Sequence, residues 1–250
     1  MDHHKFCDDL DGVINHAKNH GIEKIIIPGA DPKDLPKAIE ICEKYENVFF
    51  AVGVHPYDCE NFDESIFEFA THSKCVAIGE CGLDYYRLPE DESEKFANKH
   101  LQKEVFSSQI KIAKKLGKPL IVHIRDASHD SRVILEENGA KTVGGVLHCF
   151  NASEELLSLA NDGFYFGIGG VLTFANAKKL VHVLPKIPKQ KLLLETDAPY
   201  LTPHPFRGER NEPAMTRFVA QKIGEILGMQ TEEVEDLTSA NAFNLFKDLK

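Results

Sequence analysis

The chain has 250 residues, of which 42% are hydrophobic, and this length and composition suit one α/β barrel domain spanning residues 1–250. Charged residues make up 27% of the chain, and glycine and proline are ordinary in number, so disordered, collagen-like and low-complexity chains are excluded. Asp and Glu outnumber Lys and Arg by 39 to 29. The resulting net charge of −10 argues against binding nucleic acid through bulk charge alone.

No targeting or membrane segment is recognised in the sequence. No stretch approaches about 18 apolar residues without a charge, and the first residues lack the apolar segment of a signal peptide. We therefore expect a cytoplasmic protein without membrane contact. None of the six cysteines has C-x-x-C spacing, so we expect reduced thiols rather than disulfides or structural zinc.

Helical segments alternate with short apolar runs along the chain. The segment Asp8–His20 has helical character, and Asp31 with Pro32 is the expected start of the next helix. The longest predicted helix extends from about Glu92 to Leu116, with Phe96 among its inward-facing residues. Further helix starts are expected at Asn151 and Thr231.

The apolar runs are continuous rather than alternating, as expected for strands that are buried on both faces of a parallel sheet. Seven strands are predicted, at Lys24–Pro28, Val48–Val54, Cys75–Gly79, Pro119–Ile124, Gly145–His148, Phe164–Ile168 and Lys191–Leu194. A (β/α)8 barrel needs an eighth strand before the first helix, and residues 1–5 are not strand-like. The alternatives are an open doubly wound sheet and a TIM-like (β/α)8 barrel whose first strand is absent from this chain.

Ionisable residues gather where the predicted strands end. They are His55, Glu80, His123, Arg125, His148 and Asp197. The carboxyl ends of parallel strands form the rim of the active site in such folds, so these side chains are expected at one mouth. Imidazoles and carboxylates together suit Zn, Mn or a similar divalent ion.

Spacing supports this arrangement. His123 and Arg125 are two residues apart on a strand and point the same way, as do Glu195 and Asp197. An arginine beside a metal indicates an anionic substrate such as a phosphate. The alternative for Arg125 is a salt bridge to a nearby carboxylate: Asp84, Asp126 or Glu195.

Asp84, Tyr85 and Tyr86 form an acidic and aromatic loop. This loop could stack a nucleobase, or it could simply cover the barrel.

Six segments in order resemble the TatD family of metal-dependent hydrolases and DNases. They are GVHPYD (53–58), AIGECGLDYYR (77–87), KPLIVHIRDA (118–127), GGVLHCF (144–150), LLLETDAPYLTP (192–203) and RGERNEPA (207–214). The likeness extends from about Gly21 to NAFNLF (241–246). It implies a TIM-like barrel with a two-metal phosphodiesterase site, in which two divalent ions (Mg, Mn or Zn) are bound.

The resemblance also implies roles for individual residues. Glu80 matches the acidic metal ligand of the GECGLD motif, and His123 and His148 match ligands of one ion. Asp197 matches a ligand of the other ion and is expected, with Glu80, to act in catalysis by orienting or deprotonating the attacking water. His55 and Arg125 are expected to bind the substrate phosphate.

The sequence departs from the family pattern at its start. Family members begin with a strand that ends in His-x-His, and those two histidines bind the first metal. His3 and His4 are adjacent, so in a strand they would point to opposite faces and cannot replace that pair. Two explanations are open: the start is an internal methionine, or the chain is a genuine short form whose first metal site is incomplete.

The leading functional hypothesis is a divalent-metal deoxyribonuclease that acts from strand ends on DNA or another phosphodiester. Two alternatives are kept. One is hydrolysis of another ester or amide, such as an aminoacyl-tRNA. The other is a binding protein that is catalytically impaired because the His-x-His ligands are missing.

Overall fold

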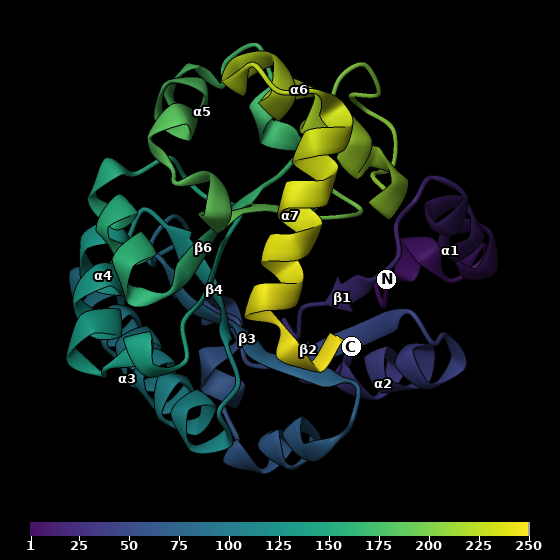
Figure 1. Ribbon diagram of the computed structural model, residues 1–250. Coiled ribbons are helices and arrows are strands. Elements are labelled where there is room, and N and C mark those ends of the chain that lie inside the picture. Colours follow the sequence, from purple (N-terminus) through teal and green to yellow (C-terminus); the bar gives the residue numbers. More distant parts are fainter. Residues whose placement is uncertain (250) are drawn as a thin grey trace.

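Seven parallel strands form one sheet in the computed structural model, which describes residues 1–249 (Figure 1). Each strand pairs with its neighbour in the sequence, so the order is β1 to β7 without a crossover. The strands are β1 (Ile25–Ile27), β2 (Val48–Val52), β3 (Cys75–Asp84), β4 (Leu120–Arg125), β5 (Gly145–His148), β6 (Phe164–Ile168) and β7 (Leu192–Leu194). All seven predicted strands are therefore confirmed.

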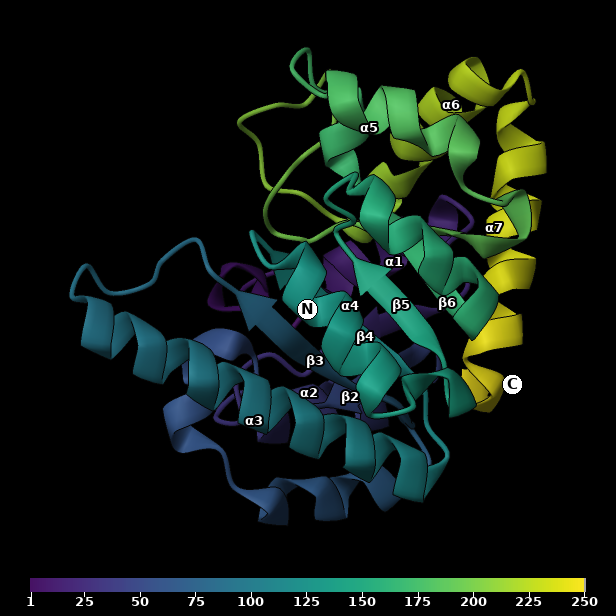
Figure 2. The same cartoon turned by 90° about the vertical axis from the view of Figure 1, so that its left-hand side faces the viewer.

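The sheet curls into an incomplete barrel with helices around its outside, as expected for a TIM-like fold (Figures 1 and 2). A doubly wound sheet would reverse its strand order at a switch point, and this sheet does not. The segment before β1 contains α1 (Leu10–Asn19) and no strand, in agreement with the expectation for residues 1–5.

Six further α-helices follow α1 in the described part of the chain. They are α2 (Leu35–Lys44), α3 (Glu92–Leu116), α4 (Ser128–Glu137), α5 (Lys178–Val183), α6 (Thr216–Leu227) and α7 (Thr231–Leu245). The predicted start of α2 was wrong by a few residues. Asp31 instead accepts a hydrogen bond from the amide of Lys33 in a turn, and Asp34 is the N-cap. The segment after Asn151 is a 3₁₀-helix, Glu154–Asp162.

Helix α3 has the predicted bounds, but Phe96 is not inside. This side chain is 75% exposed, and the first buried residue of the helix is Gln102. Figure 2 shows the reason, because the first turns of α3 extend beyond the rest of the molecule. The spacing of apolar residues predicts which face of a helix is buried. It does not show where the helix extends past the sheet that it covers.

The inside of the curl is filled by one row of side chains from each strand. These residues alternate with those that pack against the outer helices, as the period of a strand requires. The inner row comprises Phe49, Ala51, Ile121, Val146, Tyr165 and Leu193, together with Val76 and Ala77 from β3. Leu245, Phe246 and Leu249 from the end of the chain pack onto this row.

The end of α7 closes the barrel where the strands begin. Asn241 donates hydrogen bonds to the carbonyls of Lys189 and Leu192, which lie at the start of β7. Lys118, just before β4, pairs with Asp248 at a nitrogen to oxygen distance of 3.0 Å. The predicted site residues lie at the opposite end of the barrel, where the strands end.

Among residues 1–249, no helix combines the length and the apolar character that a membrane crossing requires.

We predict that Phe246→Ala lowers the free energy of unfolding by about 3–5 kcal/mol, because it removes a buried ring from the base of the barrel. The matched control is Phe96→Ala, which removes an exposed ring and should change that free energy by no more than about 0.5 kcal/mol. Urea unfolding followed by circular dichroism measures both. Equal losses in the two variants would contradict this account of the core.

Candidate metal centre

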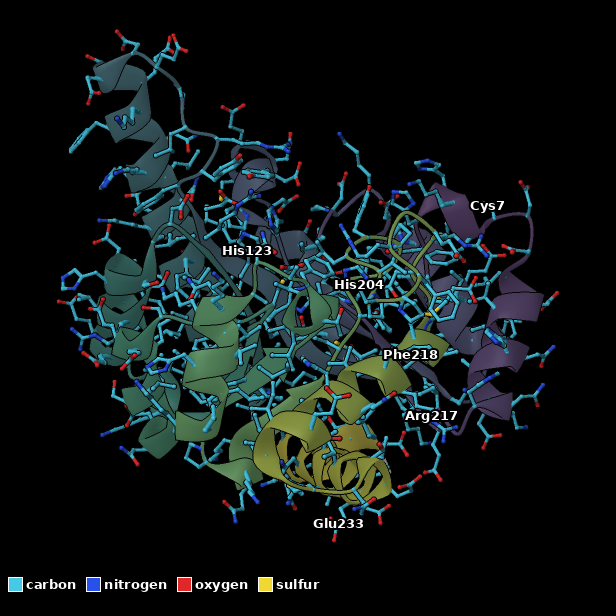
Figure 3. All side chains as sticks on the ribbon, turned by 90° about the horizontal axis from the view of Figure 1, so that it is seen from above. Cys7, His123, His204, Arg217, Phe218 and Glu233 are labelled. Carbon is cyan, nitrogen blue, oxygen red and sulfur yellow. The ribbon has the colours of Figure 1, made fainter. Side chains whose placement is uncertain are left out.

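The predicted site residues meet at the end of the barrel away from α7. In Figure 3, His123 lies toward the side of the molecule opposite Glu233, which marks the start of α7. His123 and His148 continue the inner rows of β4 and β5 that contain Ile121 and Val146. The two-residue period that packs the barrel thus also aims these imidazoles into its mouth.

Glu80 points inward because of an irregularity in β3. Strand β3 extends through Glu80 to Asp84 rather than ending at Gly79. Ile78 pairs with Leu120 and Cys81 with Val122, so β3 uses three residues where β4 uses two. An extra residue of this kind moves the following side chains to the other face of the sheet.

The buried carboxylate of Glu80 is the centre of the cluster. Its Oε1 atom lies 3.0 Å from Nδ1 of His123 and 4.0 Å from Nε2 of His148. Burial by itself would raise the pKa of Glu80, but the nearby His148 and His123 outweigh it and lower the pKa to about 2. Glu80 is therefore an anion that is held in place by imidazole rings.

His123 is fixed between two carboxylates. Its Nε2 atom lies 2.9 Å from Oδ2 of Asp84, while its Nδ1 atom faces Glu80. Burial opposes the charged ring, but hydrogen bonds to Asp84 and Glu80 raise the pKa of His123 to about 9. Asp84 therefore holds the Nε2 atom of His123, while the Nδ1 atom faces Glu80.

His148 has the same arrangement on the other side of Glu80. Its Nδ1 atom lies 2.8 Å from Oε2 of Glu195, and its Nε2 atom lies 3.5 Å from Oδ1 of Asp197. Burial opposes the charged ring, but Glu195 and Glu80 raise the pKa of His148 well above its usual value. The structure thus brings Glu80, His123, His148 and Asp197 together, as the sequence predicts.

Glu195 occupies a cradle of backbone. Both of its carboxylate oxygens accept a hydrogen bond from the amide of Cys149, at 2.9 and 3.0 Å. A Cβ atom placed on Gly167 would lie 2.1 Å from Oε2 of Glu195. Glycine at this position is therefore what lets the carboxylate reach His148.

Two glutamines of α3 position the ends of β2 and β3. The side chain of Gln109 both accepts from the amide of Val54 and donates to its carbonyl, at 2.8 and 2.9 Å. Gln102 does the same for Asp84, at 2.9 and 3.0 Å. These paired bonds fix the backbone directly beside His55 and at Asp84.

His55 lies next to His123, with 4.4 Å between their ring centroids. Ligand atoms of His55, Glu80 and His123 lie within 4.8 Å of one another. Burial lowers the pKa of His55 to about 4, so the ring is neutral. Its Nδ1 atom accepts a hydrogen bond from the amide of Tyr57, so the remaining proton is on Nε2, and this nitrogen can donate to a substrate oxygen.

Arg125 lies against an aromatic ring at the mouth of the barrel. Among residues 1–249 its guanidinium forms no ion pair with Asp84, Asp126 or Glu195, so the salt-bridge alternative is wrong. The guanidinium lies instead over the ring of Tyr86, 3.7 Å from the centroid. It stays exposed at the mouth of the barrel.

The donor set fits a divalent cation. In the described part of the chain, none of the carboxylates of Glu80, Asp84, Glu195 and Asp197 pairs with a lysine or arginine. The same negative potential that favours protonated imidazoles favours a metal ion. An outer carboxylate that holds one ring nitrogen while the other faces the site is the usual support of a metal-binding histidine.

Cys149 is the cysteine that contacts the site, through its backbone amide. All six cysteines are free thiols, as predicted. Burial raises the pKa of Cys149 to about 12, so the thiol stays protonated.

The support that Asp84 and Glu195 give to the histidines was not predicted from the sequence. Their spacing contained a signal, because Glu195 lies two residues before Asp197 on the same face of the chain. The glutamines of α3 were not predicted at all, since a polar residue in a helix is usually on the surface.

These features define a metal-dependent hydrolase built on a TIM-like barrel. A family model described as TatD related DNase matches residues 1–247. The uncharacterized metal-dependent hydrolase YabD of Bacillus subtilis (strain 168) is 44% identical over 246 residues, covering 96% of this chain and 93% of that protein. The chain belongs to the TatD family.

Two further comparisons agree. The 3'-5' ssDNA/RNA exonuclease TatD of Escherichia coli (strain K12) is 34% identical over 252 residues, covering 97% of this chain and 94% of that protein. The crystal structure of YjjV, a TatD homolog from Escherichia coli K12, superimposes with a TM-score of 0.87 at 27% identity and covers 98% and 95% of the two chains.

We predict that Gly167→Ala weakens Mn²⁺ binding about 10- to 100-fold, because the added methyl group displaces Glu195 from His148. Isothermal titration calorimetry measures the affinity. Gly12→Ala in α1 is the control, since a methyl group there meets no atom within 4 Å. Wild-type affinity in Gly167→Ala would show that Glu195 does not support the site.

Proposed function

We propose that this hydrolase is a nuclease that cleaves phosphodiester bonds in single-stranded nucleic acid. The observation that carries the proposal is the convergence of His123 Nδ1 and His148 Nε2 on the buried Glu80 carboxylate, with Asp197 facing the same nitrogen of His148. The name of the Escherichia coli relative, a 3'-5' ssDNA/RNA exonuclease, supports this choice of substrate.

Glu80, His123, His148 and Asp197 would hold the divalent ions. A bound divalent ion supplies Lewis acidity, which offsets negative charge on a phosphoryl oxygen and lowers the pKa of water. Glu80 contributes the buried negative charge that attracts the cation. Asp84 and Glu195 keep the two imidazole rings oriented toward it.

Asp197 is the base of the proposed reaction. Its side chain is 37% exposed, and only His148 lies within ion-pair distance of it in the described residues. This exposure leaves a carboxylate oxygen able to accept a proton from the attacking water. Glu80 is less suited to this step, because it is buried and already faces two imidazoles.

His55 and Arg125 would bind the phosphate. The neutral His55 ring has its proton on Nε2 and can donate to a phosphate oxygen. Arg125 adds an exposed positive charge at the mouth of a protein whose net charge is −10. Guanidinium and phosphate match as a bidentate pair.

We predict that Glu80→Gln and Asp197→Asn each lower kcat/KM on a single-stranded oligonucleotide with Mn²⁺ by at least about 100-fold, because each removes one negative oxygen from the reacting centre. Excess EDTA should abolish cleavage. The control is Glu225→Gln, an exposed carboxylate of α6 that pairs with Lys222 on the protein surface.

The substrate panel separates the proposal from its alternatives. Single-stranded DNA, single-stranded RNA and an aminoacyl-tRNA are compared at equal concentration. Release of the amino acid without cleavage of either polynucleotide would contradict the nuclease proposal. Cleavage that survives in both Glu80→Gln and Asp197→Asn would contradict the assignment of the site.

A further inference from the structure

Tyr86 and Tyr57 are exposed aromatic residues at the mouth of the barrel. Tyr86 is 58% exposed and Tyr57 is 44% exposed. Tyr86 follows the end of β3, and Tyr57 follows His55 after β2. Large rings that stay this exposed beside a candidate site mark a surface that contacts a ligand.

The ring of Tyr86 is presented by a fixed segment of chain. The neighbouring Tyr85 packs partly against the core, and its hydroxyl donates to Oδ2 of Asp130 at 2.8 Å. The amide of Tyr85 donates to the carbonyl of Arg125 at 2.9 Å. These two hydrogen bonds anchor the segment that carries Tyr86.

One face of the Tyr86 ring is already covered. The guanidinium of Arg125 lies 3.7 Å from its centroid. The exposed area of Tyr86 therefore comes from its opposite face and its edges. A planar group can stack there, and the positive charge behind the ring strengthens the attraction for a partner close to a phosphate.

The two rings are linked directly to the candidate metal centre. The amide of Tyr86 donates to Oδ1 of Asp84 at 2.9 Å, and Oδ2 of the same carboxylate holds His123 at 2.9 Å. Tyr57 packs against His55 with 4.9 Å between the ring centroids, and His55 in turn lies 4.4 Å from the ring of His123. Each exposed tyrosine is thus separated by a single residue from His123, which would hold the metal.

Resting on the proposed nuclease function, we infer that Tyr86, with Arg125 behind it, forms a stacking platform for an unpaired nucleobase next to the scissile phosphate. The ligand class is a nucleotide at the end of a single strand. Arg87, whose guanidinium lies 5.7 Å from the centroid of Tyr57, adds a second positive charge to this rim. The platform selects single strands because a base in a duplex is already stacked on its neighbours.

The test combines a change in the substrate with a change in the protein. Two single-stranded oligonucleotides are compared, one complete and one with an abasic residue at its terminal nucleotide, and each end of the strand is examined separately. For the wild-type protein with Mn²⁺, kcat/KM should be about 5- to 100-fold higher for the complete strand at one of the two ends, the range that base stacking supplies.

Tyr86→Leu should bring the ratio of kcat/KM for the complete strand to kcat/KM for the abasic strand close to 1. Leucine is a bulky side chain, but it has no flat ring on which a base can stack. Tyr86→Phe should restore the ratio, since the ring and not the hydroxyl does the stacking. Phe69→Leu is the control, because Phe69 is also an exposed ring but lies in the 3₁₀-helix Glu64–Thr71 that leads into the start of β3. Its ratio should equal that of the wild type.

The possible outcomes distinguish the stacking platform from the nuclease proposal on which it rests. If the wild-type protein cleaves both substrates equally well at both ends, the platform is overturned while the nuclease proposal stands. The same conclusion follows if Tyr86→Leu keeps the wild-type ratio. If the wild-type protein cleaves neither substrate, the nuclease proposal fails, and the platform that depends on it fails as well.

Discussion

The structure depends on one constraint, which is the burial of the Glu80 carboxylate at the mouth of the barrel. A buried anion without partners costs several kcal/mol, so the protein must surround it with positive charge or hydrogen-bond donors. Here the partners are imidazole rings from β4 and β5, held in turn by Asp84 and Glu195. The result is a cluster in which carboxylates outnumber positively charged side chains. Such a cluster favours a divalent cation over the protons that it otherwise holds.

The two-residue period of side chains along each strand places this cluster at the mouth of the barrel. The inner row of each strand is apolar where α7 closes the barrel and becomes polar at the opposite end, so His123 stands two residues beyond Ile121 and His148 two beyond Val146. The irregularities of β3 interrupt this period, and the one between Ile78 and Cys81 is what brings Glu80 inward. The same strands therefore supply both the residues of the barrel core and the residues of the site. A change in strand register would disturb the barrel core and the site together.

Much of this could be predicted from the sequence. Continuous apolar runs such as those of β4 and β5 identify buried parallel strands, and the polar residue after each run identifies the rim. What the sequence could not show depends on contacts between distant segments. The pairing of Gln109 with the backbone of Val54 spans 55 residues and leaves no local pattern. The exposure of Phe96 follows from the length of α3 relative to the sheet, and the stacking of Arg125 on Tyr86 rather than on a carboxylate follows from how β3 ends.

The most direct test of the central claim is a crystal structure of the protein grown with Mn²⁺, with data collected for anomalous scattering. The account predicts an anomalous peak at about 2.0–2.3 Å from a Glu80 oxygen and from nitrogens of His123 or His148. Asp84 and Glu195 should still bond to the outer ring nitrogens. An absence of any peak near Glu80, with His123 still hydrogen-bonded to it at saturating Mn²⁺, would contradict the account.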